Sequence, residues 1–204
     1  MKKIAIYLAG SIQKGHESHP SQWTEQDRKL LQNLLPEFKI SFLNPDIRTD
    51  DLSDQRSVFG RDMLQVYSSD LVFVDARDRR GLGVGAEMMW AKYNRIPVLT
   101  LSPKDSHYNK KSTSLLGVSV QNWVHPFVES LSDGIVSDLS EGAHWIREAL
   151  FDHSHPKKGM EFVHAAMGYY KDTQYPKDEP MKKIVSSCEM LLSRVARVPQ
   201  GSIR

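Results

Sequence analysis

Residues 71–101 have the sequence LVFVDARDRRGLGVGAEMMWAKYNRIPVLTL. The run opens with the apolar segment Leu71–Val74 and closes with Ile96–Leu101, whose proline stands at the strand entry, where a missing donor is tolerated. Between them, a glycine-rich turn leads into a helical segment expected over about Gly83–Asn94. A strand, a helix and a second strand in this order predict a parallel βαβ unit.

The flanking sequence continues this alternation. Further strands are expected at Ile4–Ala9, Lys39–Leu43 and Ile135–Val136, with helical patterns between them and a closing helix at Glu141–Leu150. The prediction is an α/β fold, a Rossmann-like doubly wound and mostly parallel sheet, over residues 1–153. Residues 105–114 are polar and are expected to form a mobile loop.

The composition changes after residue 153, and residues 154–204 are expected to form a helical C-terminal extension. Two apolar stripes at helical spacing support this prediction. Their members are Met160, Val163, Met167 and Tyr170 in the first, and Met181, Ile184, Cys188, Leu191 and Val195 in the second. The second stripe has the spacing by which one helix packs on another, within its own chain or on a partner.

Composition excludes several classes of protein. The chain has 204 residues, of which 40% are hydrophobic and 25% charged, as in globular proteins. No apolar run approaches the roughly 20 residues of a membrane span, and the first apolar residues favour a buried strand over a signal peptide. A net charge of +2 is too small to imply polymeric nucleic acid, and the single Cys188 fits a reducing cytoplasm. We therefore expect a cytoplasmic enzyme.

The glycine-rich turn is the first candidate site. Gly81, Gly83 and Gly85 follow a strand and open a helix, where main-chain N–H groups bind phosphate or another anion. The Lys-Ser/Thr ending of a P-loop is missing, and the third glycine comes one residue too early for a dinucleotide fingerprint. A tight turn without a ligand explains the glycines equally well. A short basic segment precedes the turn and contains Arg77, Arg79 and Arg80. These side chains either belong to a solvated loop or contact a bound anion.

Glu87 is the candidate reactive group. It follows the turn closely, and free N–H groups at a helix start favour an ionised carboxylate. Such a carboxylate is a nucleophile or base, or only a partner for the helix dipole. His153 and His155 have no cysteine or carboxylate cluster beside them, so neither a metal site nor a cofactor is expected.

Three separated motifs together resemble one known family. They are the Tyr7–Ile12 segment YLAGSI, Asp62 placed eight residues before Asp70, and the Gly81–Glu87 segment GLGVGAE. Over about residues 3–150 the chain resembles the nucleoside 2-deoxyribosyltransferase superfamily. Within it, the likeness is greatest to the 2′-deoxynucleoside 5′-monophosphate N-glycosidases and the cytidylate hydrolases.

The resemblance implies a role for each matching residue. Glu87 would attack C1′ of the sugar, Tyr7 would position Glu87 by a hydrogen bond, and Asp62 would lie near sugar and base. The attack would form a glycosyl ester, as in retaining glycosidases. The residues implied in substrate binding are Gly10, Ser11, Ile12, Lys14, Gly81, Gly83 and Gly85, with Ser11 near the 5′ end of the substrate.

The expected function is therefore an N-glycosidase acting on nucleosides or (deoxy)nucleoside 5′-monophosphates. Two alternatives remain open: base exchange by a deoxyribosyltransferase, and a non-catalytic nucleotide-binding or sensing protein. Gly81 stands where the nucleotide hydrolases carry serine and the transferases aspartate, so the resemblance leaves open whether the substrate is phosphorylated. Family sites are shared between subunits, which implies a homodimer or a higher homo-oligomer.

Overall fold

The computed structural model describes residues 1–10, 23–151 and 157–201. The chain divides into two compact units, residues 1–158 and residues 159–204. The division lies a few residues beyond position 153, where the change in composition placed it. None of the helices in the described ranges is long and apolar enough to cross a membrane.

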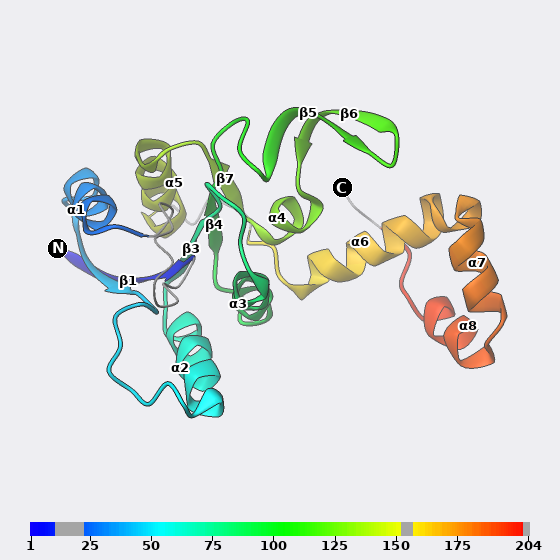
Figure 1. Cartoon of the computed structure of the whole chain (residues 1–204), viewed down its shortest axis with the longest axis horizontal. Coiled ribbons are helices and arrows are strands. Elements are labelled where there is room, and N and C mark those ends of the chain that lie inside the picture. The colour runs from blue at the N-terminus through cyan, green and yellow to red at the C-terminus, as the bar shows by residue number, and fades with distance from the viewer. Residues whose placement is uncertain (11–22, 152–156, 202–204) are drawn as a thin grey trace. The chain divides into compact units, whose positions relative to one another are not determined.

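A five-stranded parallel sheet forms the centre of the first unit (Figure 1). Its strand order is β2 (Phe38–Leu43), β1 (Lys2–Ala9), β3 (Leu71–Asp75), β4 (Val98–Leu101) and β7 (Gly134–Val136). Every neighbouring pair runs parallel, which confirms the predicted doubly wound fold. The order reverses between β1 and β3, and in such sheets ligands bind beyond the carboxyl ends of the strands at this point.

Helices cover both faces of the sheet (Figure 1). Alternate residues of each strand point to opposite faces, so β1 contributes to two cores. Ile6 and Leu8 pack with α1 (Glu25–Leu34) and α5 (Leu139–Phe151), whereas Tyr7 and Ala9 face the side of α2, α3 and α4. Those three helices span Gln55–Tyr67, Leu82–Tyr93 and Pro126–Leu131.

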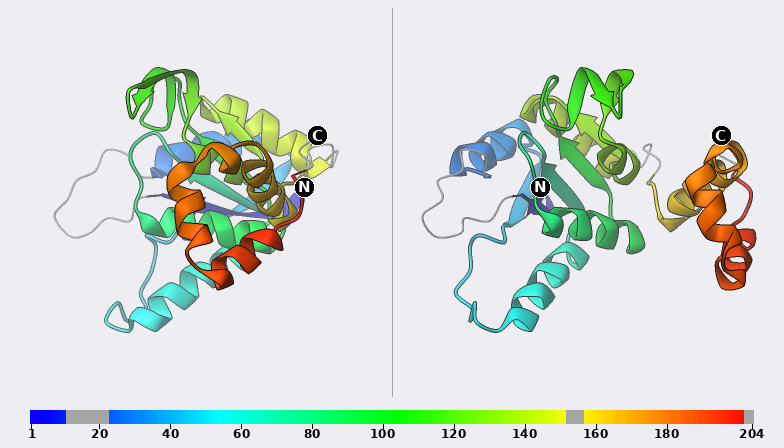
Figure 2. Two further views of the ribbon diagram at one scale, coloured as in Figure 1. Left: turned by 90° about the vertical axis from the view of Figure 1, so that its right-hand side faces the viewer. Right: turned by 45° about the vertical axis from the view of Figure 1, so that its right-hand side comes forward.

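The expectation of a mobile loop at residues 105–114 is wrong. Strands β5 (Asn109–Leu115) and β6 (Val118–Val124) form an antiparallel hairpin outside the parallel sheet (Figure 2). Its turn consists of Leu116 and Gly117, with φ angles of 49° and 83°. Two left-handed residues in succession are typical of the tight turn that joins two antiparallel strands.

The second unit is helical, which confirms the predicted C-terminal helical region. It contains α6 (Met160–Thr173), the short 3-10 helix η1 (Tyr175–Lys177), α7 (Glu179–Ser186) and α8 (Glu189–Ala196). The second predicted stripe is wrong as a single helix, because the chain breaks at Cys188, which caps α8 in an extended conformation. Among the described residues of the second unit, Val185 is the most deeply buried apolar residue.

Candidate active site

Tyr7 and Glu87 meet inside the first unit. Tyr7 lies on β1 and is fully buried, and Glu87 lies on α3 with 6% of its surface exposed. The Tyr7 hydroxyl donates a hydrogen bond to Glu87 Oε1 over 2.9 Å. Burial and the neighbouring carboxylate hold the pKa of Tyr7 far above its ordinary value, so the phenol stays protonated and remains a donor.

The charge state of Glu87 differs from the sequence expectation. Burial raises its pKa from 4.5 to about 7, the hydrogen bond from Tyr7 opposes this rise, and the charge of Asp62 adds to it. The helix N-terminus does not prevent the rise, because α3 begins at Leu82 and Glu87 lies beyond its first turn. Glu87 therefore exchanges a proton near neutral pH.

One oxygen of Glu87 is held and the other is not. Oε1 accepts the hydrogen bond from Tyr7, whereas Oε2 is buried and has no hydrogen-bond partner among the described residues. A buried carboxylate oxygen without a partner is costly in a folded protein and needs an explanation. Oε2 is therefore the oxygen of this carboxylate that the described residues leave without a hydrogen bond.

Asp62 comes to the same place from α2. It is 8% exposed, and its Oδ1 lies 3.6 Å from Nη1 of both Arg48 and Arg61. Burial raises the pKa of Asp62, and the two guanidinium groups oppose that rise. Oδ1 has no hydrogen-bond partner among the residues that the structure describes. Tyr7, Glu87 and Asp62 thus form one group, in which burial raises the pKa of both carboxyl groups.

The two arginines beside Asp62 are functional candidates that the sequence did not reveal. Arg48 is held by Asp50, through Nε–Oδ1 and Nη2–Oδ2 distances of 2.8 and 2.5 Å. Arg61 donates to the carbonyl of Ile47 over 2.7 Å and so ties this loop to α2. An aspartate two residues after an arginine was the only local signal, and such pairs are common in solvated loops.

The predicted glycines lie in three places. A Cβ on Gly83 would lie 3.9 Å from Glu87 Oε1, so this glycine faces the carboxylate. Gly81 and Gly85 line a separate cavity instead. Gly10 directly follows β1, and a Cβ there would meet the indole of Trp23 at 3.3 Å. Ser11, Ile12 and Lys14 lie outside the described residues.

The basic segment before the glycine turn has a structural role. Arg77 and Arg80 both bind Asp75, the fully buried last residue of β3, with N–O distances of 3.0 and 2.9 Å. Arg77 also reaches Asp27 on α1 over 3.1 Å. These two guanidinium groups neutralise a buried carboxylate. Arg79 is exposed.

The described part of the chain contains no cluster of side chains that could bind a metal ion. Within residues 1–10, 23–151 and 157–201, no group of three or more histidine, cysteine, aspartate or glutamate side chains is arranged to hold a metal ion. His153 and His155 lie outside these ranges. The polar groups that the fold brings together at this site are Glu87, Asp62 and the protonated phenol of Tyr7.

Comparison with known proteins defines the class of fold and no more. No protein-family model matches the sequence, and no curated protein matches it. Among solved structures, a conserved protein from Enterococcus faecalis V583 is similar, with a TM-score of 0.53 and 16% sequence identity. The match covers 71% of this chain and 98% of the other. At this identity the likeness supports the α/β fold alone.

Proposed function

We propose that the chain is an N-glycosidase that cleaves the bond between base and sugar in nucleosides or (deoxy)nucleoside 5′-monophosphates. The observation that carries the proposal is the buried Glu87 carboxylate, with Oε1 fixed by Tyr7 at 2.9 Å and Oε2 without a partner among the described residues. The motif resemblance to the nucleoside 2-deoxyribosyltransferase superfamily, which assigns these two residues their roles, supports it.

In the first step, Glu87 Oε2 forms a bond to C1′ while the C1′–N bond breaks and its electron pair leaves with the base. The ionised carboxylate stabilises the positive charge that develops on the sugar. The leaving base needs a proton, and Asp62 is the second buried carboxyl group beside Glu87. Burial raises the pKa of Asp62, which favours the protonated form that this role requires.

In the second step, water attacks C1′ of the glycosyl ester and releases the sugar, and Glu87 leaves as a carboxylate. A proton from the water passes to the ionised Asp62, so the enzyme returns to its starting state. If a second free base attacks in place of water, the same ester yields an exchanged nucleoside. Hydrolysis and base exchange therefore share the first step and differ only in the acceptor.

A 5′-phosphate would bind at the start of α3. Gly81 caps this helix without a side-chain hydrogen bond, so the first N–H groups of α3 are candidates for an anion. Ser11 and Lys14, which lie outside the described residues, are the side chains that the resemblance adds. It also implies a homodimer that shares its sites.

A panel of nucleosides and 5′-monophosphates, with the free base separated by chromatography, tests the proposal. The wild type is expected to release base, and Glu87→Gln is expected to lose roughly a thousandfold or more in rate. Glu129→Gln is the control, because this exposed glutamate belongs to the same unit. Activity of Glu87→Gln within tenfold of the wild type would contradict the assignment.

The same assay distinguishes the remaining alternatives. A labelled second base, added in excess, yields a labelled nucleoside only if the ester is passed to a base. Faster cleavage of monophosphates than of matching nucleosides, with competition by inorganic phosphate, would support an anion site at α3. Tight nucleotide binding without any release of base would identify a binding protein.

A further inference from the structure

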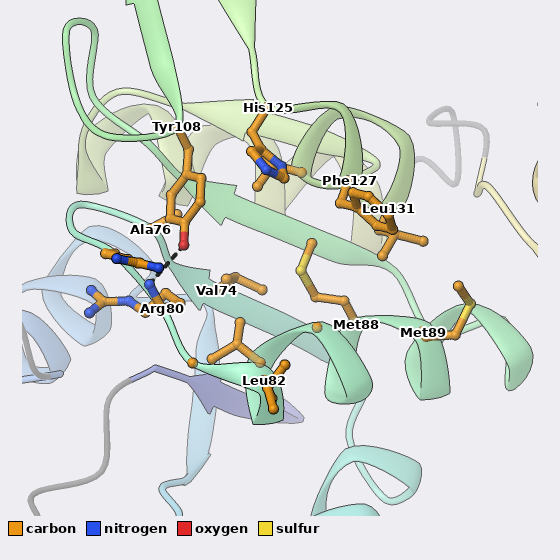
Figure 3. Close-up of a pocket in the computed structure, with 15 residues that line it drawn as sticks. Val74, Ala76, Arg80, Leu82, Met88, Met89, Tyr108, His125, Phe127 and Leu131 are labelled. Atoms are coloured by element: carbon orange, nitrogen blue, oxygen red, sulfur yellow. Dashed lines mark hydrogen bonds between the residues drawn. The ribbon is translucent and has the colours of Figure 1, made fainter. Parts of the chain in front are cut away.

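A cavity of about 580 Å³ lies between α3, α4 and the two residues that flank the β5–β6 hairpin, Tyr108 and His125 (Figure 3). Its volume falls within the range of pockets that bind small molecules, roughly 300–1,000 Å³. Val74 and Ala76, at the end of β3, form part of its wall, and Met88 of α3 points into it. The cavity therefore lies at the carboxyl end of the sheet, where ligands of doubly wound proteins bind.

This cavity is separate from the group around Glu87. Residues 81, 85 and 88 lie on one side of α3, because four and three positions complete about one helical turn. Glu87 lies well away from that side of the helix and faces Tyr7 of β1. Neither of these residues, nor Asp62, lines the cavity.

Aromatic side chains form the wall opposite α3. Figure 3 shows Tyr108, His125 and Phe127 directed toward the helix. The ring of His125 lies 5.4 Å from that of Tyr108 and 5.9 Å from that of Phe127, measured between centroids. The main-chain N–H of Arg80 donates to the Tyr108 hydroxyl over 2.7 Å, which ties this wall to the segment before α3.

Two features of the cavity are unexplained by packing alone. His125 Nδ1 is buried and has no hydrogen-bond partner in the described part of the chain. Gly85 sits inside α3, where glycine costs about 1 kcal/mol relative to alanine, yet a Cβ there would meet nothing within 4 Å. The imidazole of His125 and an open helix surface thus border the same cavity.

The charges around the cavity have one sign. Its described lining contains no aspartate or glutamate, and its charged side chains are Arg79 and Arg80. Arg80 binds Asp75, whereas Arg79 is exposed. These charges favour an anion.

We propose that this cavity binds a flat aromatic molecule that carries one negative charge. The ring lies among Tyr108, His125 and Phe127. The negative group lies toward Arg79. The site is distinct from the group around Glu87, and the proposal stands whether or not the chain cleaves nucleosides.

Two fluorescent probes with the same ring system test the proposal. 1-Anilinonaphthalene-8-sulfonate carries the negative charge, and N-phenyl-1-naphthylamine lacks it. The wild type is expected to bind one equivalent of the sulfonate in this cavity, more tightly than the neutral probe. Arg79→Ala is expected to weaken sulfonate binding severalfold and to leave the neutral probe unchanged.

A filling substitution tests the location. Gly85→Leu places a side chain in the open cavity and favours the helix, so it is expected to fold and to weaken both probes at least tenfold. Gly60→Leu is the matched control, because Gly60 lies on α2 and also has nothing within 4 Å of its Cβ position. Phe127→Ala, at an exposed position, is a second variant that should weaken both probes.

Three results would overturn the proposal. Wild-type affinity for both probes in Gly85→Leu and Phe127→Ala would place probe binding elsewhere on the chain. If the two probes bind equally and Arg79→Ala affects neither, the cavity does not select a ligand with a negative charge. A lower mass by light scattering for Gly85→Leu, but not for Gly60→Leu, would show that another protein copy fills the cavity.

Discussion

Glu87→Gln is expected to stabilise the protein at pH 8 while it abolishes catalysis. The buried carboxyl group has a pKa of about 7 in the folded chain and an ordinary value of 4.5 in the unfolded one. Below pH 4.5 both states hold the proton and the group has no effect on the free energy of unfolding. Between the two values the unfolded chain releases the proton and the folded chain keeps it, so stability falls as the pH rises.

The magnitude follows from the same two values. Each pH unit between 4.5 and 7 removes about 1.4 kcal/mol from the free energy of unfolding, so the loss is about 3 kcal/mol above pH 7. Glutamine has a similar shape but no charge to bury, so Glu87→Gln avoids this loss. The variant should exceed the wild type by about 3 kcal/mol at pH 8 and by much less at pH 5.

Urea denaturation followed by tryptophan fluorescence measures this difference. All four tryptophans lie in the first unit, so the signal reports the part of the chain that contains the site: Trp23, Trp90, Trp123 and Trp145. Glu129→Gln, which changes an exposed glutamate of that unit, should show little effect at either pH. A stability difference for Glu87→Gln that is the same at pH 5 and pH 8 would refute the reasoning.

Three further substitutions have definite expected outcomes. Tyr7→Phe removes the hydrogen bond that lowers the pKa of Glu87, so its rate should fall roughly 10- to 100-fold and its pH–rate profile should shift upward. A pH–rate profile that does not shift would show that Tyr7 does not control the pKa of Glu87. Asp133→Ala leaves the buried Lys92 ammonium without this carboxylate and should cost about 3–5 kcal/mol in urea denaturation. Gly142→Ala places a Cβ 2.9 Å from the ring of Phe73 and should cost about 1–3 kcal/mol, and a variant as stable as the wild type would show that α5 can shift.

The parallel sheet could be predicted from the sequence because its strands are short apolar runs. Leu71–Asp75 and Val98–Leu101 are buried at every position, so they stand out as continuous runs between polar turns. The β5–β6 hairpin lacks this signal. Strand β5 is polar and largely exposed, so no apolar alternation marks it. Gly117, at the tip of the turn, was the remaining indication.

The break between α7 and α8 was hidden by the apolar spacing. Met181, Ile184, Cys188 and Leu191 recur as on one helix, yet Cys188 adopts φ −144° and caps a new helix. Periodicity records which residues share a helix face but not whether the main chain is continuous between them. Both helices are only 8 residues long, so neither is stable without packing on neighbouring elements.

The pKa of Glu87 could not be predicted from the order of the residues alone. A reading of the sequence sees only the helix start, which favours the ionised form. In the fold, Tyr7 from β1 and Asp62 from α2 close around the carboxyl group, and the loss of water outweighs the hydrogen bond from Tyr7. Burial depends on elements that are distant in sequence, so the pKa of this group follows from the packing of the whole unit. The same burial that destabilises the protein at pH 8 keeps Oε2 away from water, and in the proposed reaction this strengthens its attraction to the charge that develops on the sugar.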